Sequence, residues 1–86
     1  MSVEIPRLAR GVRMRVENDD TAFLLVPEGV LELNATARAI LLLVDGRRSA
    51  SGIAVALARQ YDASPYQMLD DVNELCASMR IFGFLL

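Results

Sequence analysis

The feature of this sequence that most limits its fold is a change of hydrophobic period near residue 34. Before it, short apolar segments alternate with polar residues or form brief runs, as is typical of β-strands. After it, apolar residues recur at three- and four-residue spacing, as in amphipathic helices. Because strands come first and helices follow, the sequence predicts an α+β fold, in which a small three-stranded antiparallel sheet precedes a winged-helix-like bundle of three helices.

Three strands are predicted after an extended arm of residues 1–11. They span Val12–Val16, Ala22–Val26 and Val30–Leu33. The first and third alternate apolar and polar side chains, which predicts half-buried strands. Pro27 has no N–H to donate, so the second strand is expected to end before it, at a corner formed by Pro27-Glu28-Gly29.

Three helices are predicted within residues 34–83. They span Ala35–Asp45, a segment that begins near residue 50 and ends near Tyr61, and Pro65 to about Phe82. Good N-cap residues precede them: Asn34, then Ser49 or Ser51, then Ser64, for which Gln67 is expected to close a capping box. Gly46 and Gly83 are expected just past the ends of the first and third helices.

Length allows one domain, residues 1–86, with one modest core. The sequence has no histidine, so the commonest general base and metal ligand is missing. The single cysteine, Cys76, cannot build a zinc or iron–sulfur site. We therefore expect a binding domain that is not an enzyme, with no catalytic residue, metal site or cofactor of its own.

Charge and hydropathy limit the partners. The formal net charge of -2 argues against nucleic acid, which normally requires a basic face. The apolar stretch Ala39–Val44 is too short to span a bilayer, and the N-terminus has no long apolar run typical of a signal peptide. A cytoplasmic protein that binds another polypeptide is expected. A winged-helix nucleic-acid-binding regulator and a plain dimerisation module are the alternatives.

The third strand and the third helix are the predicted binding elements. If Val30–Leu33 lies at a sheet edge, its free backbone groups can pair with an added peptide strand. The third helix carries more apolar surface than one core-facing stripe needs, so part of it can line a groove. A weaker prediction is that Arg10, Arg13 and Arg15 dock an acidic partner surface, the alternative being a solvent face paired with nearby acidic residues.

Several short motifs occur in a recognisable order along nearly the whole chain. They are Leu8-Ala9-Arg10-Gly11-Val12-Arg13, Pro27-Glu28, Leu31-x-Leu33-Asn34, Ile40-Leu41, Asp45-Gly46-Arg47 and Asp71-Val72. Each motif is weak alone, but together over residues 5–86 they resemble the PqqD family of pyrroloquinoline quinone (PQQ) biosynthesis. One departure is Gly52, where the second helix in the family often carries an acidic residue.

The resemblance implies a peptide chaperone and recognition element. Such proteins bind the ribosomal precursor peptide PqqA and present it to PqqE, a radical S-adenosylmethionine (SAM) enzyme that holds the iron–sulfur cluster. The peptide adds as a strand between the third strand and third helix. By this match the expected peptide-binding residues are Val30, Leu31, Glu32, Leu33, Met68, Leu69, Asp71, Val72, Leu75, Cys76 and Met79. A homodimer formed by exchange of the N-terminal hairpin is a further possibility that the sequence leaves open.

Overall fold

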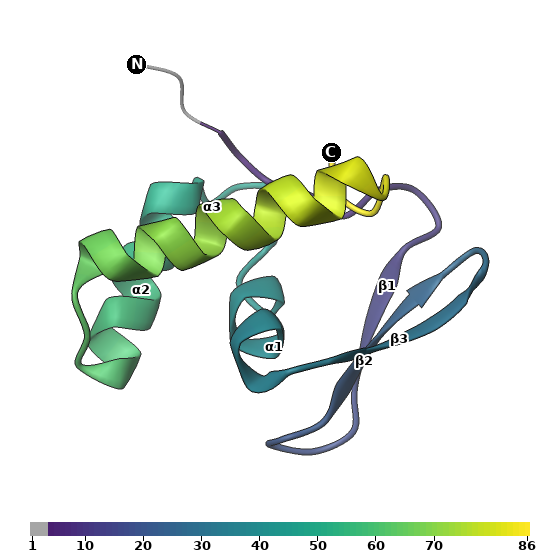
Figure 1. The fold of residues 1–86 in the computed structure, drawn as a ribbon, viewed down its shortest axis with the longest axis horizontal. Helices are drawn as coiled ribbons and strands as arrows, with labels where there is room; N and C mark the ends of the chain where they lie inside the picture. Colours follow the sequence, from purple (N-terminus) through teal and green to yellow (C-terminus); the bar gives the residue numbers. More distant parts are fainter. Residues whose placement is uncertain (1–3) are drawn as a thin grey trace.

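The computed structural model describes residues 4–86 and has the predicted order of elements, with a sheet beside three helices (Figure 1). The strands are β1 (Arg13–Val16), β2 (Ala22–Val26) and β3 (Gly29–Leu33), and the helices are α1 (Ala35–Leu41), α2 (Ala50–Tyr61) and α3 (Pro65–Ile81). The predicted α+β fold is confirmed. Residues 1–3 of the predicted arm lie outside the described residues.

The sheet is antiparallel, with strand order β1-β2-β3. Arg13 lies opposite Leu25 in the first pair of strands, and Leu31 lies opposite Leu24 in the second. Residues directly opposite each other share a face, so Leu24 and Leu31 both point to the inner side of the sheet. Leu24 is fully buried there, and Leu33 at the end of β3 is also buried.

Helix α1 is shorter than predicted, because it ends at Leu41 and not at Asp45. After Leu41 the backbone tightens: the N–H of Leu43 donates to the carbonyl of Ile40, and that of Val44 to the carbonyl of Leu41. These three-residue hydrogen bonds replace the four-residue pattern of an α-helix. Gly46 has a φ of +77°, but it lies in the following loop and does not end the helix.

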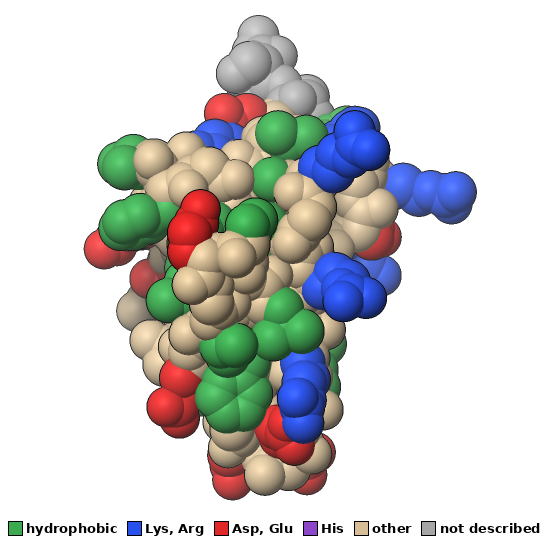
Figure 2. Space-filling model, turned by 90° about the vertical axis from the view of Figure 1, so that its right-hand side faces the viewer, with side chains coloured by type: hydrophobic (Ala, Val, Ile, Leu, Met, Phe, Trp, Pro, Cys, Tyr) green, Lys and Arg blue, Asp and Glu red, His purple; other side chains and the backbone are tan. Residues whose placement is uncertain are grey.

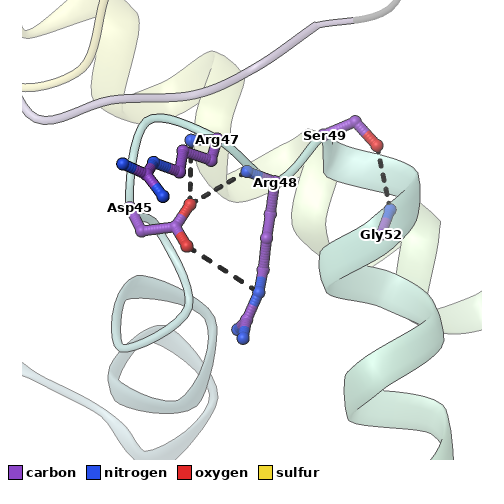
Figure 3. A network of polar contacts seen from close by, with 5 residues as sticks. All are labelled: Asp45, Arg47, Arg48, Ser49 and Gly52. Carbon is purple, nitrogen blue, oxygen red and sulfur yellow. Dashed lines mark hydrogen bonds and ion pairs between the residues drawn. The ribbon is translucent and has the colours of Figure 1, made fainter.

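A loop connects α1 to α2 and is held by two side-chain caps (Figure 3). Asp45 Oδ1 accepts hydrogen bonds from the backbone N–H groups of Arg47 and Arg48, both at 2.9 Å. Ser49, and not Ser51, is the N-cap of α2, because its Oγ accepts a hydrogen bond from the N–H of Gly52 at 3.1 Å. Both caps satisfy backbone donors that would otherwise lack partners.

Helix α3 begins and ends with different kinds of cap. Ser64 occupies the N-cap position before Pro65, but its side chain makes no capping hydrogen bond, so the predicted capping box with Gln67 does not form. At the other end, Gly83 has a φ of +79° and its N–H donates to the carbonyl of Arg80. The backbone dihedral that glycine favours therefore terminates this helix, as the sequence predicted.

The N-terminal arm and the C-terminal tail pair with each other. Leu8 and Leu85 form an antiparallel bridge, and the N–H of Leu86 donates to the carbonyl of Arg7 at 2.9 Å. Arg80 Nη1 also donates to Oε2 of Glu4 at 3.2 Å. The described part of the arm is thus attached to the end of α3.

One hydrophobic core connects the sheet to the helices. Its most completely buried side chains include Leu24 from β2, Ile40 from α1, Ile53 from α2, and Val72 and Cys76 from α3. Within residues 4–86, no helix has the length and apolar character needed to cross a membrane. The same part of the chain has no cluster of three or more acidic or cysteine side chains that could hold a metal ion.

Candidate functional site

Strand β3 lies at an open edge of the sheet, which is the condition that the predicted strand addition requires. Its register fixes which backbone groups are free. Val26 and Gly29 pair across the two-residue turn, so they exchange hydrogen bonds, and bonded pairs then recur at every second residue. The backbone groups of Leu31 and Leu33 therefore bond to β2. Those of Val30 and Glu32 point away from the sheet.

The side chains of β3 divide in the same way between two faces. Val30 is 61% exposed and Glu32 is also exposed, on the outer face. Leu31 is 39% exposed although it lies on the inner face beside buried Leu24. An apolar side chain on the inner face that stays partly exposed marks a place where the sheet edge is not covered by a helix of the described chain.

A groove continues from the end of β3 to the middle of α3. We call it the main groove, with a volume of about 400 Å³, lined by Asn34, Thr36, Ala37, Asp71, Glu74, Leu75 and Ser78. Ala37 and Leu75 supply apolar surface, and the other lining side chains are polar. The Oδ1 of Asn34 already accepts the N–H of Ala37 at 2.8 Å, which fixes the start of α1 beside the groove.

The α3 residues predicted for peptide binding do not all reach the surface. Leu69, Leu75 and Met79 are half-buried and pack against the core, and Leu75 lines the main groove. Val72 and Cys76 are fully buried core residues, so they support the helix and cannot touch a ligand in this structure. Burial raises the pKa of the Cys76 thiol, which favours its protonated, unreactive form.

A second hollow lies on the other side of Asp71. We call it the side pocket. It has a volume of about 180 Å³, and Met68, another predicted site residue, lines it together with Leu57 and Tyr61 of α2. Asp71 and Thr36 line both hollows, so the side pocket adjoins the main groove.

The main groove is acidic. Asp71 and Glu74 are the charged residues of its lining, and no arginine contributes to it. Neither carboxylate forms a hydrogen bond or an ion pair with any other residue in the range 4–86. Asp71 is half-buried, whereas its neighbour Asp70 is exposed and lines neither hollow. A groove of this charge favours a ligand segment with basic groups.

The three arginines predicted to dock a partner lie elsewhere. Arg13 and Arg15 are exposed on the same face of β1, and Arg10 is exposed in the arm before it. Figure 2 views the end of the molecule that carries the sheet, where arginine side chains lie along one margin beside hydrophobic side chains. Arg15 Nε contacts Glu17 Oε1 at 2.7 Å, so part of the predicted alternative, pairing within the hairpin, is present.

Sequence reasoning missed five residues that line the main groove: Asn34, Thr36, Ala37, Glu74 and Ser78. Two of them carried a usable signal. Asn34 caps the helix that directly follows β3, so the first turn of α1 must lie at the end of the edge strand. Glu74 lies three residues after Asp71, and residues at this spacing share one side of a helix.

Three comparisons bear on this architecture. The family model described as coenzyme PQQ synthesis protein D (PqqD) matches residues 21–85. The chain is 44% identical over 62 residues to the PqqA binding protein of Pseudomonas aeruginosa PAO1, and the match covers 71% of this chain and 67% of that protein. It is 43% identical over 75 residues to the PqqA binding protein of Methylococcus capsulatus, covering 86% of this chain and 78% of the relative.

A longer relative and a solved structure match the same family. The bifunctional coenzyme PQQ synthesis protein C/D of Methylorubrum extorquens is 40% identical over 77 residues, covering 88% of this chain, which spans only 21% of that protein. The solution NMR structure of the PqqD truncation of Methylobacterium extorquens PqqCD superposes with a TM-score of 0.81 at 40% identity, covering 94% of this chain and 87% of that one. That truncation is described as a functional, stand-alone recognition element for ribosomally synthesized and post-translationally modified peptides.

The open strand edge beside a groove defines a small α+β binding domain. The chain belongs to the PqqD family, as its motifs predicted. The prediction of a binding domain and not an enzyme is also confirmed, because relatives are named as a PqqA binding protein and as a recognition element.

Proposed function

We propose that this protein binds the precursor peptide PqqA along β3 and the main groove, and presents it to the radical SAM enzyme PqqE in PQQ biosynthesis. The open edge of β3 next to a groove is the single observation that carries the proposal. The names of the relatives supply the identity of the peptide. The single buried cysteine is compatible with the reducing cytoplasm, where ribosomal peptides are made.

The free backbone groups of β3 would supply the affinity. Val30 and Glu32 each offer one N–H and one C=O at the edge, which makes four groups that an added peptide strand can satisfy. Alternate side chains of that strand would lie on the inner face beside Leu31 and above Leu75, where apolar surface remains uncovered. The carboxylates of Asp71 and Glu74 would favour a basic residue at the end of the bound segment.

Arg10, Arg13 and Arg15 are proposed to dock an acidic surface of PqqE. They lie on β1 and the arm, and β2 separates β1 from β3, so peptide and enzyme would occupy different edges of the sheet. Charge reversal at Arg13 should then weaken the complex with PqqE and leave PqqA affinity unchanged. A loss of PqqA affinity in the same variant would argue against separate surfaces.

A homodimer remains a prediction. Exchange of the β1–β2 hairpin would move Ala22 and Leu24 from their own core into that of a second copy. Sedimentation with and without PqqA separates this exchange from pairing of two β3 edges, because only edge pairing would compete with the peptide.

An amide-shift titration with synthetic PqqA tests the proposal. The amides of Val30 and Glu32 should shift on saturable binding, and duplex DNA at low salt should produce no such shifts. Glu32→Pro removes an N–H that points away from the sheet. An edge strand tolerates proline at such a position. One lost backbone hydrogen bond is worth about 1 kcal/mol, or roughly a fivefold loss of affinity.

Glu32→Ala is the matched control, because it removes the same side chain but keeps the N–H. Equal PqqA affinity in the folded proline and alanine variants would contradict strand addition. Proline at Leu31 is unsuitable for this test, because the N–H of Leu31 bonds to β2 and its loss would damage the sheet itself.

A further inference from the structure

The side pocket combines apolar walls from three helices. Its apolar lining includes Ala39 from α1, Leu57 from α2 and Met68 from α3, and Tyr61 also lines it with 53% of its surface exposed. A cavity of about 150 Å³ lined by apolar side chains is large enough to hold a benzene ring. At about 180 Å³, the side pocket can accept one large apolar side chain.

The side pocket adjoins the main groove at two shared residues. Thr36 and Asp71 line both hollows, with Thr36 in the first turn of α1 and Asp71 in the second turn of α3. A peptide that pairs with β3 and continues past Asn34 along the main groove would reach these two residues, which also line the side pocket. The side pocket is then within reach of the next side chain of that peptide.

The charge of Asp71 indicates which residue of such a peptide would lie next to the one in the side pocket. Asp71 is the charged group in the lining of the side pocket, and it is half-buried without a hydrogen-bond or ion-pair partner among residues 4–86. A carboxylate in this position is best satisfied by a Lys or Arg side chain. The surrounding apolar walls favour an apolar or aromatic residue next to that base.

We propose that the side pocket is a second subsite for the precursor peptide, which takes one large apolar side chain of a peptide residue adjacent to a Lys or Arg that pairs with Asp71. This inference rests on the proposed function, because it extends the same bound peptide beyond β3. The occupied pocket would fix the register of the added strand, since backbone pairing along β3 alone permits slippage by two residues.

Two amides of α2 give a direct readout. Leu57 and Tyr61 line the side pocket but belong to neither β3 nor the main groove. In a titration with synthetic PqqA, their signals should shift together with those of Val30 and Glu32. If Val30 and Glu32 shift while Leu57 and Tyr61 do not, strand addition stands and the second subsite is overturned. If none of the four shifts, the proposed function itself fails.

Filling the pocket provides a second test. Ala35 lies at the start of α1, is exposed and lines the side pocket, so Ala35→Phe should fill it without disturbing the core. PqqA affinity should fall by about tenfold or more, the effect of losing one buried apolar side chain. Ala77→Phe is the control, because Ala77 is exposed on α3 and lines neither hollow. Equal affinity of the two variants would overturn the subsite.

The charge is tested by a matched pair of neighbours. Asp71→Asn should weaken PqqA binding by about two- to fivefold and reduce its salt dependence, whereas Asp70→Asn should change neither. An alanine scan of PqqA should then find one apolar residue whose replacement matters in the wild-type chain but not in Ala35→Phe. If Ala35→Phe instead dissociates a dimer and leaves PqqA affinity unchanged, the pocket serves a second copy of the chain and the proposal is overturned.

Discussion

The backbone N–H of Phe84 donates to the carbonyl oxygen of Met79 at 2.9 Å, across the end of α3. Together with the bond from Gly83 to Arg80, this contact forms a Schellman cap, in which the residue after the helix adopts a left-handed conformation. The cap turns the chain back so that Leu85 can pair with Leu8. The position of the whole C-terminal tail therefore depends on the backbone of one glycine.

Gly83→Ala should destabilise the protein by about 1–2 kcal/mol, because a side chain at a φ of +79° is strained. Apart from Gly83 and its two chain neighbours, no described residue has an atom within 4 Å of the added Cβ, so the cost comes from the local backbone alone. Thermal unfolding measures it, with roughly 4–8 °C of melting temperature per kcal/mol for a domain of this size.

Gly52→Ala is the matched substitution, and it is expected to raise the stability of the protein where Gly83→Ala lowers it. Gly52 lies in the first turn of α2 with an ordinary helical backbone, and its added Cβ would contact Ser49 Oγ at 3.5 Å, a normal van der Waals distance. Alanine should therefore stabilise by about 0.5 kcal/mol. Destabilisation of similar size at both glycines would mean that the φ of Gly83 is not the cause.

Acid should weaken the loop that precedes α2. Backbone hydrogen bonds from Arg48 and Arg47, with the nearby charge of Arg48, lower the pKa of Asp45 below its ordinary value of 3.8. The carboxylate thus contributes stability above pH 3.8, and this contribution is lost as the pH falls through the lowered pKa. An NMR titration should show the Arg47 and Arg48 amides following the protonation of Asp45.

Asp45→Asn separates the charge from the turn. An asparagine Oδ1 can still accept both backbone N–H groups, so the loop should keep its shape while the acid-dependent amide shifts disappear. Asp45→Ala should lose the turn at every pH. Persistence of the acid transition in the asparagine variant would assign that transition to another group.

The ends of helices and strands were predictable from the sequence where a single residue determines the local backbone. The end of β2 follows from Pro27, which has no N–H to donate, and the end of α3 follows from Gly83, which adopts a positive φ without strain. The end of α1 did not follow, because the apolar run continues through Val44 while the backbone already tightens after Leu41. Periodicity cannot distinguish a helix from a tighter turn over so few residues.

The candidate site was predictable only in part, for a similar reason. Helical spacing placed Val72, Leu75 and Cys76 on one apolar surface, but which of them is core depends on how α3 packs against the rest of the molecule. The side pocket needs Leu57 and Tyr61 from α2 beside Met68. That contact is formed by tertiary packing, and no motif within either helix predicts it.

Alanine substitutions at Val72 and Leu75 should distinguish a residue of α3 that stabilises the fold from one that contacts the peptide. Val72 is fully buried, so Val72→Ala should destabilise by about 2 kcal/mol through lost burial and a small cavity, while the folded fraction binds PqqA normally. Leu75 is half-buried in the main groove, so Leu75→Ala should cost less stability and weaken PqqA binding about tenfold. Chemical unfolding and calorimetric titration measure the two effects independently. If Val72→Ala weakens binding by the folded fraction as much as Leu75→Ala does, then α3 must move when the peptide binds, because only a shifted helix could bring Val72 to the ligand.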